Sequence, residues 1–313
     1  MSVDDEPAYV GRLAPSPSGL LHLGHFQTFY IAQERARRHN GRLFLRVEDL
    51  DTGRCKPGLL PTMMDDMRWM GFVWDDPISC CAQDNSGKNK TYLSQSDDLT
   101  AYKGALKKLY DGGFIYPSHA TRGEIQLAVK ENEAASTTSR DGEIIFPMAL
   151  RESCPTDLAD SSGVEGVNWR FKVPYDSPLP VSFHDIAQGP QVFEAGHDFG
   201  DFVVWTKLGK PSYELAVVVD DAIEGVTEVV RGGDLLLSTA RQLLLYRALG
   251  LVVPDFFHCP LVHDANGRRL AKRVNSEAIG CLREANYTPE EVRRTFFQIP
   301  PEELESLIEK KKV

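Results

Sequence analysis

Residues 12–25 read Arg-Leu-Ala-Pro-Ser-Pro-Ser-Gly-Leu-Leu-His-Leu-Gly-His, and they separate two kinds of local structure. The two prolines and the glycine at 15–19 cannot continue a central strand, so this part is predicted to be a loop. Residues 8–14 read as a short strand before the loop, and apolar residues at helical spacing predict a helix over 23–38 after it. Residues 42–48 form the next predicted strand. A strand, a glycine-containing loop, a helix and a strand make one βαβ unit, which indicates a parallel sheet.

Further along the chain, the pattern indicates that this sheet is interrupted. A helix is predicted over 59–70 and another after a cap at Ser96, whereas residues 118–165 are polar, weakly periodic and predicted to be rich in loops. Strands are predicted at 169–173 and 202–205, and the continuous apolar run at 213–219 is typical of a strand buried on both faces. A helix capped by Ser238 then covers 238–249, and a short helical region begins at Pro289.

The predicted fold is therefore α/β, a Rossmann-type parallel sheet that an α+β insertion splits, with a short helical C-terminal tail. We expect the first half of the Rossmann domain over 1–110, an insertion resembling an acceptor-binding domain over 111–195, the second half over 196–255, and a basic loop with the helical tail over 256–313.

Composition is ordinary for a soluble globular protein. Hydrophobic residues make up 42% and charged residues 26% of the 313 residues, and no apolar run is long enough to span a bilayer. The six cysteines show neither metal-ligand spacing nor a disulfide framework, and the N-terminus is acidic rather than signal-like, so a cytoplasmic location is expected. The net charge of −10 gives no support for RNA binding, which rests on cationic patches.

The first candidate site is the pair of histidines in His22-Leu-Gly24-His25. They lie where a strand hands over to a helix, and a helix N-terminus offers free N–H groups to phosphate. Gly24 would let adenine approach the backbone, and the imidazoles could donate to phosphate oxygens as charge develops on them. Taken alone, the motif also fits a helix start with one core and one surface histidine, or a pair of metal ligands.

Two further groups of residues carry chemistry only in combination. The basic run at 267–273 could stabilise a pyrophosphate leaving group, although a charge run by itself more often lies in solvent. Arg12, Glu48, Tyr213 and Arg231 are predicted at strand ends, where open α/β sheets bind ligands. Arginines for carboxylates and an acid for an ammonium group would suit a dicarboxylic amino acid, but each residue alone fits an ordinary ion pair.

Four collinear segments resemble the glutamyl-tRNA synthetase family of class I aminoacyl-tRNA synthetases. They are the stretch 12–25, Arg-Val-Glu-Asp-Leu-Asp at 46–51, Val-Val-Arg-Gly-Gly-Asp-Leu at 229–235, and Arg-Leu-Ala-Lys-Arg at 269–273. The first and last are similar to the HIGH and KMSKS motifs of that class. The chain is most similar to the short branch of the family, the glutamyl-queuosine tRNA(Asp) synthetases. It stops about forty residues after the second motif, and it carries Val217 where the full-length enzymes commonly have Asn.

The resemblance implies a ligase that uses ATP with Mg²⁺ to form glutamyl-adenylate and transfers glutamate to queuosine in the anticodon of tRNA(Asp), without tRNA in the activation step. It implies a glutamate site made of Arg12, Ala14, Ser16, Glu48, Tyr213 and Arg231. It implies an ATP site made of His22, Gly24, His25, Arg269, Leu270 and Lys272, of which His22, His25 and Lys272 serve the adenylyl transition state. A monomer is expected.

The chain departs from the family pattern in two places. Many members hold zinc through Cys-x-Cys and Tyr-x₃-Cys, but the corresponding positions here are Ser118, Ala120, Phe146 and Leu150, so we expect no zinc. Ala271 stands where the late motif usually has serine. Three alternatives stay open: a truncated or split glutamyl-tRNA synthetase that charges tRNA(Glu), a small-molecule nucleotidyltransferase that shares the HxGH loop, and a non-catalytic paralogue.

Overall fold

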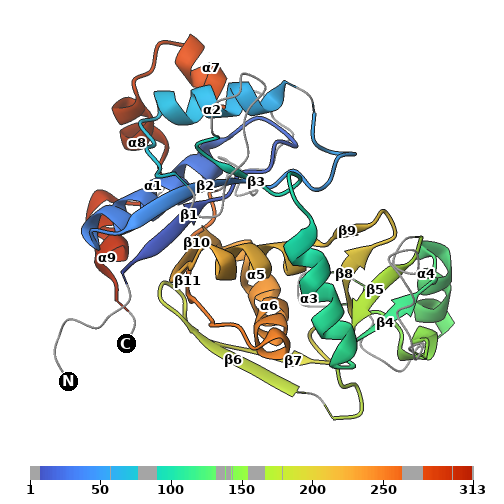
Figure 1. Ribbon diagram of the computed structural model, residues 1–313. Coiled ribbons are helices and arrows are strands. Elements are labelled where there is room, and N and C mark those ends of the chain that lie inside the picture. The colour runs from blue at the N-terminus through green and yellow to red at the C-terminus, as the bar shows by residue number, and fades with distance from the viewer. Residues whose placement is uncertain are drawn as a thin grey trace.

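The computed structural model describes residues 8–56, 58–76, 90–131, 138, 142, 144–153, 166–177, 179–262, 278–297 and 299–311. The elements form two parts (Figure 1). One holds the N-terminal strands together with the C-terminal helices, and the other holds the middle of the chain.

The strands that position the site run parallel. They are β1 (Val10–Leu13), β2 (Arg42–Val47), β3 (Leu93–Ser94), β6 (Leu179–Asp185), β10 (Glu228–Gly232) and β11 (Asp255–Cys259). Strand β2 lies between β1 and β3, and β11 lies between β10 and β6, all in parallel pairings. The two sets meet where the backbone N–H of Thr227 donates to the carbonyl of Val10 at 2.9 Å. The expected parallel sheet is thus confirmed, and the strand order reverses between β1 and β10.

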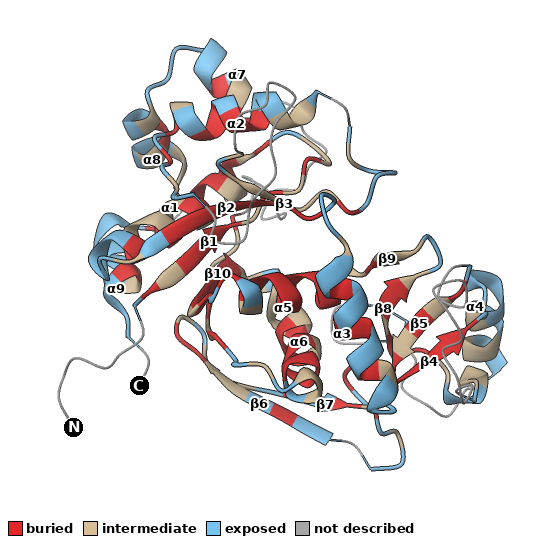
Figure 2. Ribbon diagram, viewed as in Figure 1, coloured by how far each residue is buried: buried red, intermediate tan, exposed pale blue. Residues whose placement is uncertain are grey.

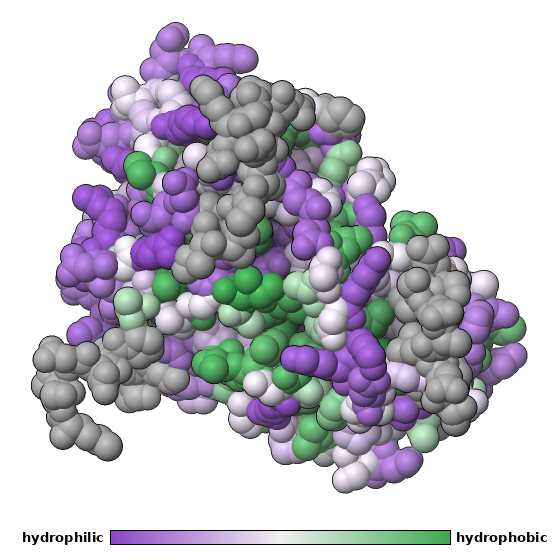
Figure 3. Space-filling model, in the orientation of Figure 1, coloured by the Kyte–Doolittle hydropathy of each residue, from purple (hydrophilic) through white to green (hydrophobic). Residues whose placement is uncertain are grey.

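Helices pack on this sheet and around it. They are α1 (Leu23–Arg38), α2 (Leu59–Trp69), α3 (Thr100–Asp111), α5 (Tyr213–Ile223), α6 (Leu236–Leu249), α7 (Ile279–Glu284), α8 (Pro289–Phe296) and α9 (Pro301–Glu309). Helix α1 connects β1 to β2, as the spacing predicts. Buried residues follow the sheet and the helix faces that meet it (Figure 2). On the face that Figure 3 shows, hydrophobic residues gather over α5 and α6.

The C-terminal helix α9 is held to the N-terminal part by a buried arginine. Both Arg35 Nε and Nη2 donate to the Glu228 carboxylate at 2.6 Å, and Nη1 donates to the carbonyls of Leu307, Ile308 and Lys310. A guanidinium can serve both partners because its five N–H groups point in fixed directions. The arginine therefore joins α1, β10 and the end of the described chain.

A second, antiparallel sheet lies beside α3, α5 and α6 (Figure 1). Its order is β4 (Ile115–Ser118), β5 (Asn168–Phe171), β8 (Phe202–Thr206) and β9 (Lys210–Pro211). Strand β7 (Gly189–Ala195) forms a hairpin with β6. The helix α4 (Arg122–Glu131) and the 3₁₀ turn at Met148–Leu150 lie in the stretch predicted to be loop-rich.

The strand predicted at 213–219 is wrong, because these residues form the first part of α5. Every residue from Glu214 to Asp221 is buried, so this part of the helix is covered on all sides. A continuous apolar run reads the same in a buried strand and in a buried helix, and the tertiary packing overrides the strand preference of the valines. The overlooked signal is Ser212, whose hydroxyl accepts from the N–H of Leu215 at 3.5 Å as the helix cap.

The two serine caps are also misplaced. Helix α3 begins at Thr100, and the Ser96 hydroxyl instead donates to Asp49 Oδ2 at 2.6 Å. Helix α6 begins at Leu236 after a 3₁₀ turn at Gly233–Leu235, so Ser238 lies within its first turn and donates to Glu214 at 2.8 Å. In both cases the helix begins at another residue, and the serine hydroxyl donates to a carboxylate elsewhere in the chain.

Among the described residues, no helix combines the length and the apolar character that crossing a bilayer requires.

Candidate active site

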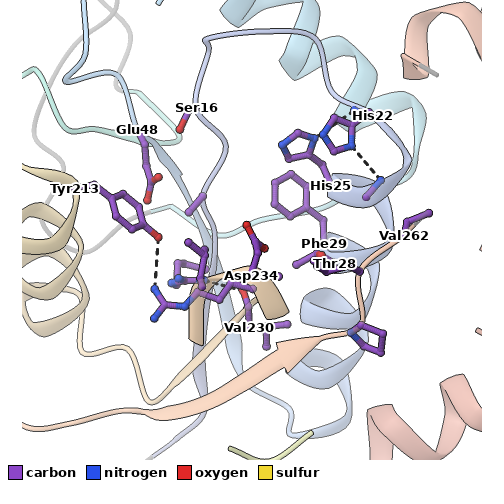
Figure 4. Close-up of a pocket in the computed structure, with 18 residues that line it drawn as sticks. Ser16, His22, His25, Thr28, Phe29, Glu48, Tyr213, Val230, Asp234 and Val262 are labelled. Carbon is purple, nitrogen blue, oxygen red and sulfur yellow. Dashed lines mark hydrogen bonds between the residues drawn. The ribbon is translucent and has the colours of Figure 1, made fainter. Parts of the chain in front are cut away.

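A cleft of about 660 Å³ opens at the carboxyl ends of β1 and β10, where the strand order reverses. Open α/β sheets bind ligands at this point because neighbouring loops diverge there to opposite faces. The described lining comes from the loop after β1, the start of α1, the ends of β2, β10 and β11, and the first residue of α5. In the view of Figure 4, His22 and His25 lie on one side, Glu48 and Tyr213 on the other, and Asp234 between them.

The histidine loop is shaped by the start of α1. His22 is the N-cap residue, and its Nδ1 accepts from the N–H of Gly24 at 3.1 Å. His25 completes a reciprocal cap, because its Nδ1 accepts from the N–H of His22 at 3.3 Å. A ring nitrogen that accepts from a backbone N–H carries no proton, so the neutral rings hold their protons at Nε2. The geometry thus assigns each imidazole an Nε2–H donor beside the cleft.

Behind the opposite wall lies a network of buried charges. Arg46 is fully buried and binds Asp221 at 2.5 Å and Glu48 at 3.2 Å, and Arg12 Nε also reaches Asp221 at 3.3 Å. Arg12 further donates from Nη1 to the carbonyl of Val230 at 3.0 Å, which ties β1 to β10. Burial raises the pKa of Glu48 above its ordinary value, although Arg46 and Arg12 pull it down. The ionised Glu48 carboxylate at the cleft is therefore destabilised by desolvation, and a cationic ligand would stabilise it.

Arg231 differs from these arginines because neutral groups hold it. Its Nε donates to His258 Nε2 at 3.1 Å, and its Nη2 donates to Thr239 Oγ1 at 2.6 Å and Gln242 Oε1 at 2.8 Å. Its Nη1 lies 3.4 Å from the hydroxyl of Tyr213 (Figure 4), and desolvation of that hydroxyl raises its pKa to about 12. Among the residues described, no carboxylate pairs with this guanidinium, which is only 5% exposed. A buried cation without a counter-ion is a ready site for an anion.

The structure brings most of the predicted residues together. Nine of them line the one cleft: Arg12, Ala14, Ser16, His22, Gly24, His25, Glu48, Tyr213 and Arg231. Tyr213 does so from the first turn of a helix rather than from a strand end. Arg269, Leu270, Ala271 and Lys272 lie outside the described residues. Their individual roles stay predictions.

Sequence reasoning missed several lining residues and the layer behind them. Asp234 lines the cleft from the 3₁₀ turn after β10, and it was present in the Val-Arg-Gly-Gly-Asp segment without a role being assigned. Thr28 and Phe29 line it from α1, and residues 260–262 line it after β11. Asp221 and His258 do not line it, and no local pattern marks them, because their side-chain partners are 175–209 and 19–73 residues away.

The four positions that replace the family's zinc ligands lie near a carboxylate-centred cluster. Ser118 is the end of β4, and its hydroxyl accepts from Arg170 at 3.3 Å, while Phe146 lies under the same guanidinium at 4.0 Å. Asp201 accepts from Arg151 through both oxygens at 2.6 and 2.9 Å, from Tyr116 at 2.6 Å and from the N–H of Val173 at 2.8 Å. These bonds tie the segment after Phe146 to β4 and β5. Over the described part of the chain, no three His, Cys, Asp or Glu side chains form a metal-binding group.

We predict that this cluster, rather than a metal, stabilises the antiparallel sheet. Asp201→Ala leaves buried donors of Arg151 and Tyr116 unpaired, so the free energy of unfolding in urea should fall by about 3–5 kcal/mol. The exposed control Asp111→Ala, which loses only a surface pair with Lys107, should change it by less than about 0.5 kcal/mol. Chelation with EDTA should leave the melting temperature unchanged. A drop in melting temperature on chelation would contradict the prediction.

The fold and the HxGH cleft together define the catalytic domain of a class I tRNA synthetase. The chain matches the family of class I tRNA synthetases (E and Q), catalytic domain, over residues 9–313. A protein named glutamyl-Q tRNA(Asp) synthetase from Symbiobacterium thermophilum is 40% identical over 90% of this chain and 83% of its own length. A protein of the same name from Geobacter sulfurreducens is 37% identical over 96% of this chain and 88% of its own length.

Solved structures show the same fold. Glutamate-tRNA synthetase from Elizabethkingia anophelis superposes with a TM-score of 0.76 at 24% identity over 98% of this chain and 66% of that one. A glutamate tRNA ligase from Elizabethkingia meningosepticum, solved in complex with its amino acid, gives a TM-score of 0.74 at 25% identity. This superposition covers 98% of this chain and 65% of that one. The chain spans about two thirds of these two proteins.

The chain belongs to the glutamyl-Q tRNA(Asp) synthetase family within the class I tRNA synthetases, and it is a ligase.

Proposed function

We propose that this ligase activates L-glutamate with MgATP as an enzyme-bound glutamyl-adenylate and transfers the glutamyl group to queuosine in the anticodon of tRNA(Asp). The observation that carries the first half is the buried Arg231, which lacks a carboxylate partner among the described residues and lines the same cleft as Glu48, His22 and His25. The second half rests on the relatives, which are named for that acceptor.

Glutamate recognition follows from the two kinds of charge in the cleft. Arg231 offers a fixed guanidinium for the side-chain carboxylate, with the Tyr213 hydroxyl beside it at 3.4 Å. Glu48 offers a carboxylate for the ammonium group. Arg12, Ala14 and Ser16 line the wall between the sheet and the histidine loop, where the substrate's reacting carboxylate would lie.

ATP would bind against the start of α1. The helix N-terminus favours phosphate, and the Nε2–H groups of His22 and His25 are fixed donors for charge that develops on the α-phosphate. The glutamate carboxylate itself attacks phosphorus and pyrophosphate leaves, so no protein nucleophile is needed. Mg²⁺ enters with the ATP phosphates, as is usual for this ion.

The late basic segment belongs to the same proposal. Val262 lines the cleft, and Ala278 forms a β-bridge with His22, so both neighbours of residues 263–277 lie at the ATP end of the site. This placement supports the roles proposed for Arg269, Leu270 and Lys272 in holding the triphosphate. We also propose that residues 111–195, with the antiparallel sheet, form the insertion that meets the RNA.

The test is the exchange of pyrophosphate into ATP by the purified protein without tRNA. Exchange should depend on L-glutamate and be much weaker with glutamine or aspartate. Transfer is then followed by isolating the queuosine nucleoside from tRNA(Asp) and measuring the mass added by one glutamyl group. Charging of the 3′ ribose of tRNA(Glu) instead would favour a truncated or split glutamyl-tRNA synthetase, and no exchange would favour a non-catalytic paralogue.

The raised pKa of Glu48 predicts a pH dependence of glutamate binding. A carboxyl group with a raised pKa takes up its proton at higher pH than an ordinary glutamate, and the protonated form cannot pair with ammonium. The KM for glutamate should therefore be constant at high pH and rise as the pH falls through this pKa, by up to about tenfold per pH unit. In the Glu48→Gln variant the KM for glutamate should be high at every pH. In the wild type the KM for ATP should not rise as the pH falls in the way that the KM for glutamate does. A wild-type curve that persists in this variant would contradict the assignment.

A further inference from the structure

His258 is a fully buried, titratable side chain that does not line the cleft. It lies on β11 directly beside Arg231 of β10, and Asp185 ends β6 on the other side of β11. Neighbouring residues in a parallel ladder present their side chains to the same face of the sheet. Three adjacent strands thus place Asp185, His258 and Arg231 in a row behind the glutamate end of the cleft.

The hydrogen bonds along this row run in one direction. Asp185 Oδ2 lies 2.6 Å from His258 Nδ1, and its other oxygen accepts from the N–H groups of Ala187 and Gln188 at 3.0 and 2.8 Å. The hydrogen bond to the His258 ring, together with the backbone N–H of Gln188, outweighs burial, which alone would raise the pKa of Asp185, and holds this pKa below its ordinary value. An ionised Asp185 can only accept, so His258 Nδ1 carries the proton.

The other end of the row requires His258 to be neutral. Arg231 Nε lies 3.1 Å from His258 Nε2, and a guanidinium nitrogen can only donate. The lone pair at Nε2 must therefore be present, which an imidazolium lacks. Burial, with the positive charge of Arg231, keeps the pKa of His258 below its ordinary value despite the bond to Asp185.

The consequence for Arg231 is a fixed orientation without loss of charge. Nε and Nη2 face His258, Thr239 and Gln242, so Nη1 is left to face the cleft and Tyr213. Had one of these partners been a carboxylate, it would have competed with an anionic substrate for the guanidinium. Arg12 shows the contrast, because Asp221 already neutralises it.

We propose that His258 is a positioning residue that orients Arg231 toward the side-chain carboxylate of the amino-acid substrate, and that Asp185 holds His258 in the tautomer this requires. The inference rests on the proposed activation of glutamate and adds the group that sets selectivity for a carboxylate over a carboxamide. Locking the arginine before the substrate arrives removes part of the ordering cost of binding.

Two substitutions at 258 separate the two ring nitrogens. His258→Asn places an amide donor near the former Nδ1 and removes the acceptor for Arg231, whereas His258→Gln places an amide oxygen near the former Nε2. In glutamate-dependent exchange, the Asn variant should raise the KM for glutamate by about 10–100-fold with kcat and the KM for ATP within about threefold. The preference for glutamate over glutamine should shrink with it. The Gln variant should recover most of the loss.

A matched control tests general damage to β11. Phe257 is buried on the opposite face of this strand from His258. Phe257→Leu should therefore lower the melting temperature and leave the KM for glutamate unchanged. Thr239→Val provides a second route, because it removes the acceptor of Arg231 Nη2, a hydroxyl that also lies 3.0 Å from His258 Nε2, with little change of shape, and it should raise the same KM. An unchanged KM in His258→Asn, an equal loss in His258→Gln, or a rise that Phe257→Leu reproduces would overturn the proposal.

A measurement on the wild-type protein does not depend on any variant folding. In ¹⁵N-labelled protein, long-range proton–nitrogen correlation should show His258 neutral at pH 7 with its proton on Nδ1. A charged ring, or a proton on Nε2, would overturn the proposal even if exchange proceeds normally. Absence of glutamate-dependent exchange in the wild type would instead contradict the proposed activation reaction, so the two failures are distinguishable.

Discussion

Replacing Arg231 with methionine is expected to lower kcat/KM for glutamate by about 10²–10³-fold, the largest effect of a single substitution in the glutamate end of the cleft. The side-chain carboxylate would lose its charge-assisted hydrogen-bonding partner at Nη1 and be left in a desolvated pocket, and the expected loss corresponds to about 2.7–4 kcal/mol. Most of the loss should appear as a higher KM for glutamate, because the side chain is bound equally in the ground state and the transition state. The KM for ATP should stay near the wild-type value.

The controls for Arg231 distinguish charge from geometry. Arg231→Lys keeps the positive charge but not the planar fork that His258, Thr239 and Gln242 hold, so its activity should lie between those of the wild type and the methionine variant. Glutamine has no charge to lose, so the methionine variant should discriminate far less between glutamate and glutamine. If Arg231→Met retains the wild-type KM for glutamate, the carboxylate binds elsewhere in the cleft.

Replacing either histidine of the HxGH loop with asparagine is expected to lower kcat by about 10²–10³-fold. Removing one fixed donor to charge that develops in a transition state costs about 2.7–4 kcal/mol. Asparagine suits this experiment because its Oδ1 can still accept from the Gly24 N–H in His22→Asn, or from the His22 N–H in His25→Asn. The start of α1 is then preserved while the Nε2–H donor is removed, and the KM for glutamate should change little. The steady-state rate of glutamate-dependent pyrophosphate exchange at saturating substrates measures the effect.

The matched alanine variant at 22 separates catalysis from capping. His22→Ala should lose the same factor in kcat and about 1 kcal/mol of stability in addition, because Gly24 N–H is left without its cap. If His22→Asn is as active as the wild type while His22→Ala is not, the residue acts only as a helix cap. The proposed role at the α-phosphate would then be wrong.

How far the sequence could predict the fold depended on the distance over which each signal acts. The unit β1–α1–β2 was predictable because its loop and its helix spacing lie within residues 8–48. Helix α5 was not, because a run of apolar residues shows that a segment is buried but not whether its backbone is helical or extended. The caps predicted at Ser96 and Ser238 were wrong because the helices begin at Thr100 and Leu236, and the two hydroxyls donate to Asp49 and Glu214 instead.

The site shows the same division. Eight of the nine predicted residues that line the cleft lie in three short motifs, and the exception is Tyr213. The layer that holds them could not be named from such motifs, because Asp221 reaches Arg12 across 209 residues and Asp185 reaches His258 across 73. A buried carboxylate in a sequence looks like any other acid until its partner is known.

By itself, then, the amino-acid sequence determined that this protein has a parallel α/β sheet with an HxGH loop, and it named the arginines, the acid and the histidines that the structure brings into one cleft. Only the tertiary structure decided that Arg231 is held by neutral acceptors while Arg12 and Arg46 are already paired. The reason is physical: the charge that a buried arginine can offer a substrate depends on the groups packed around it, and those groups come from strands far apart in the chain.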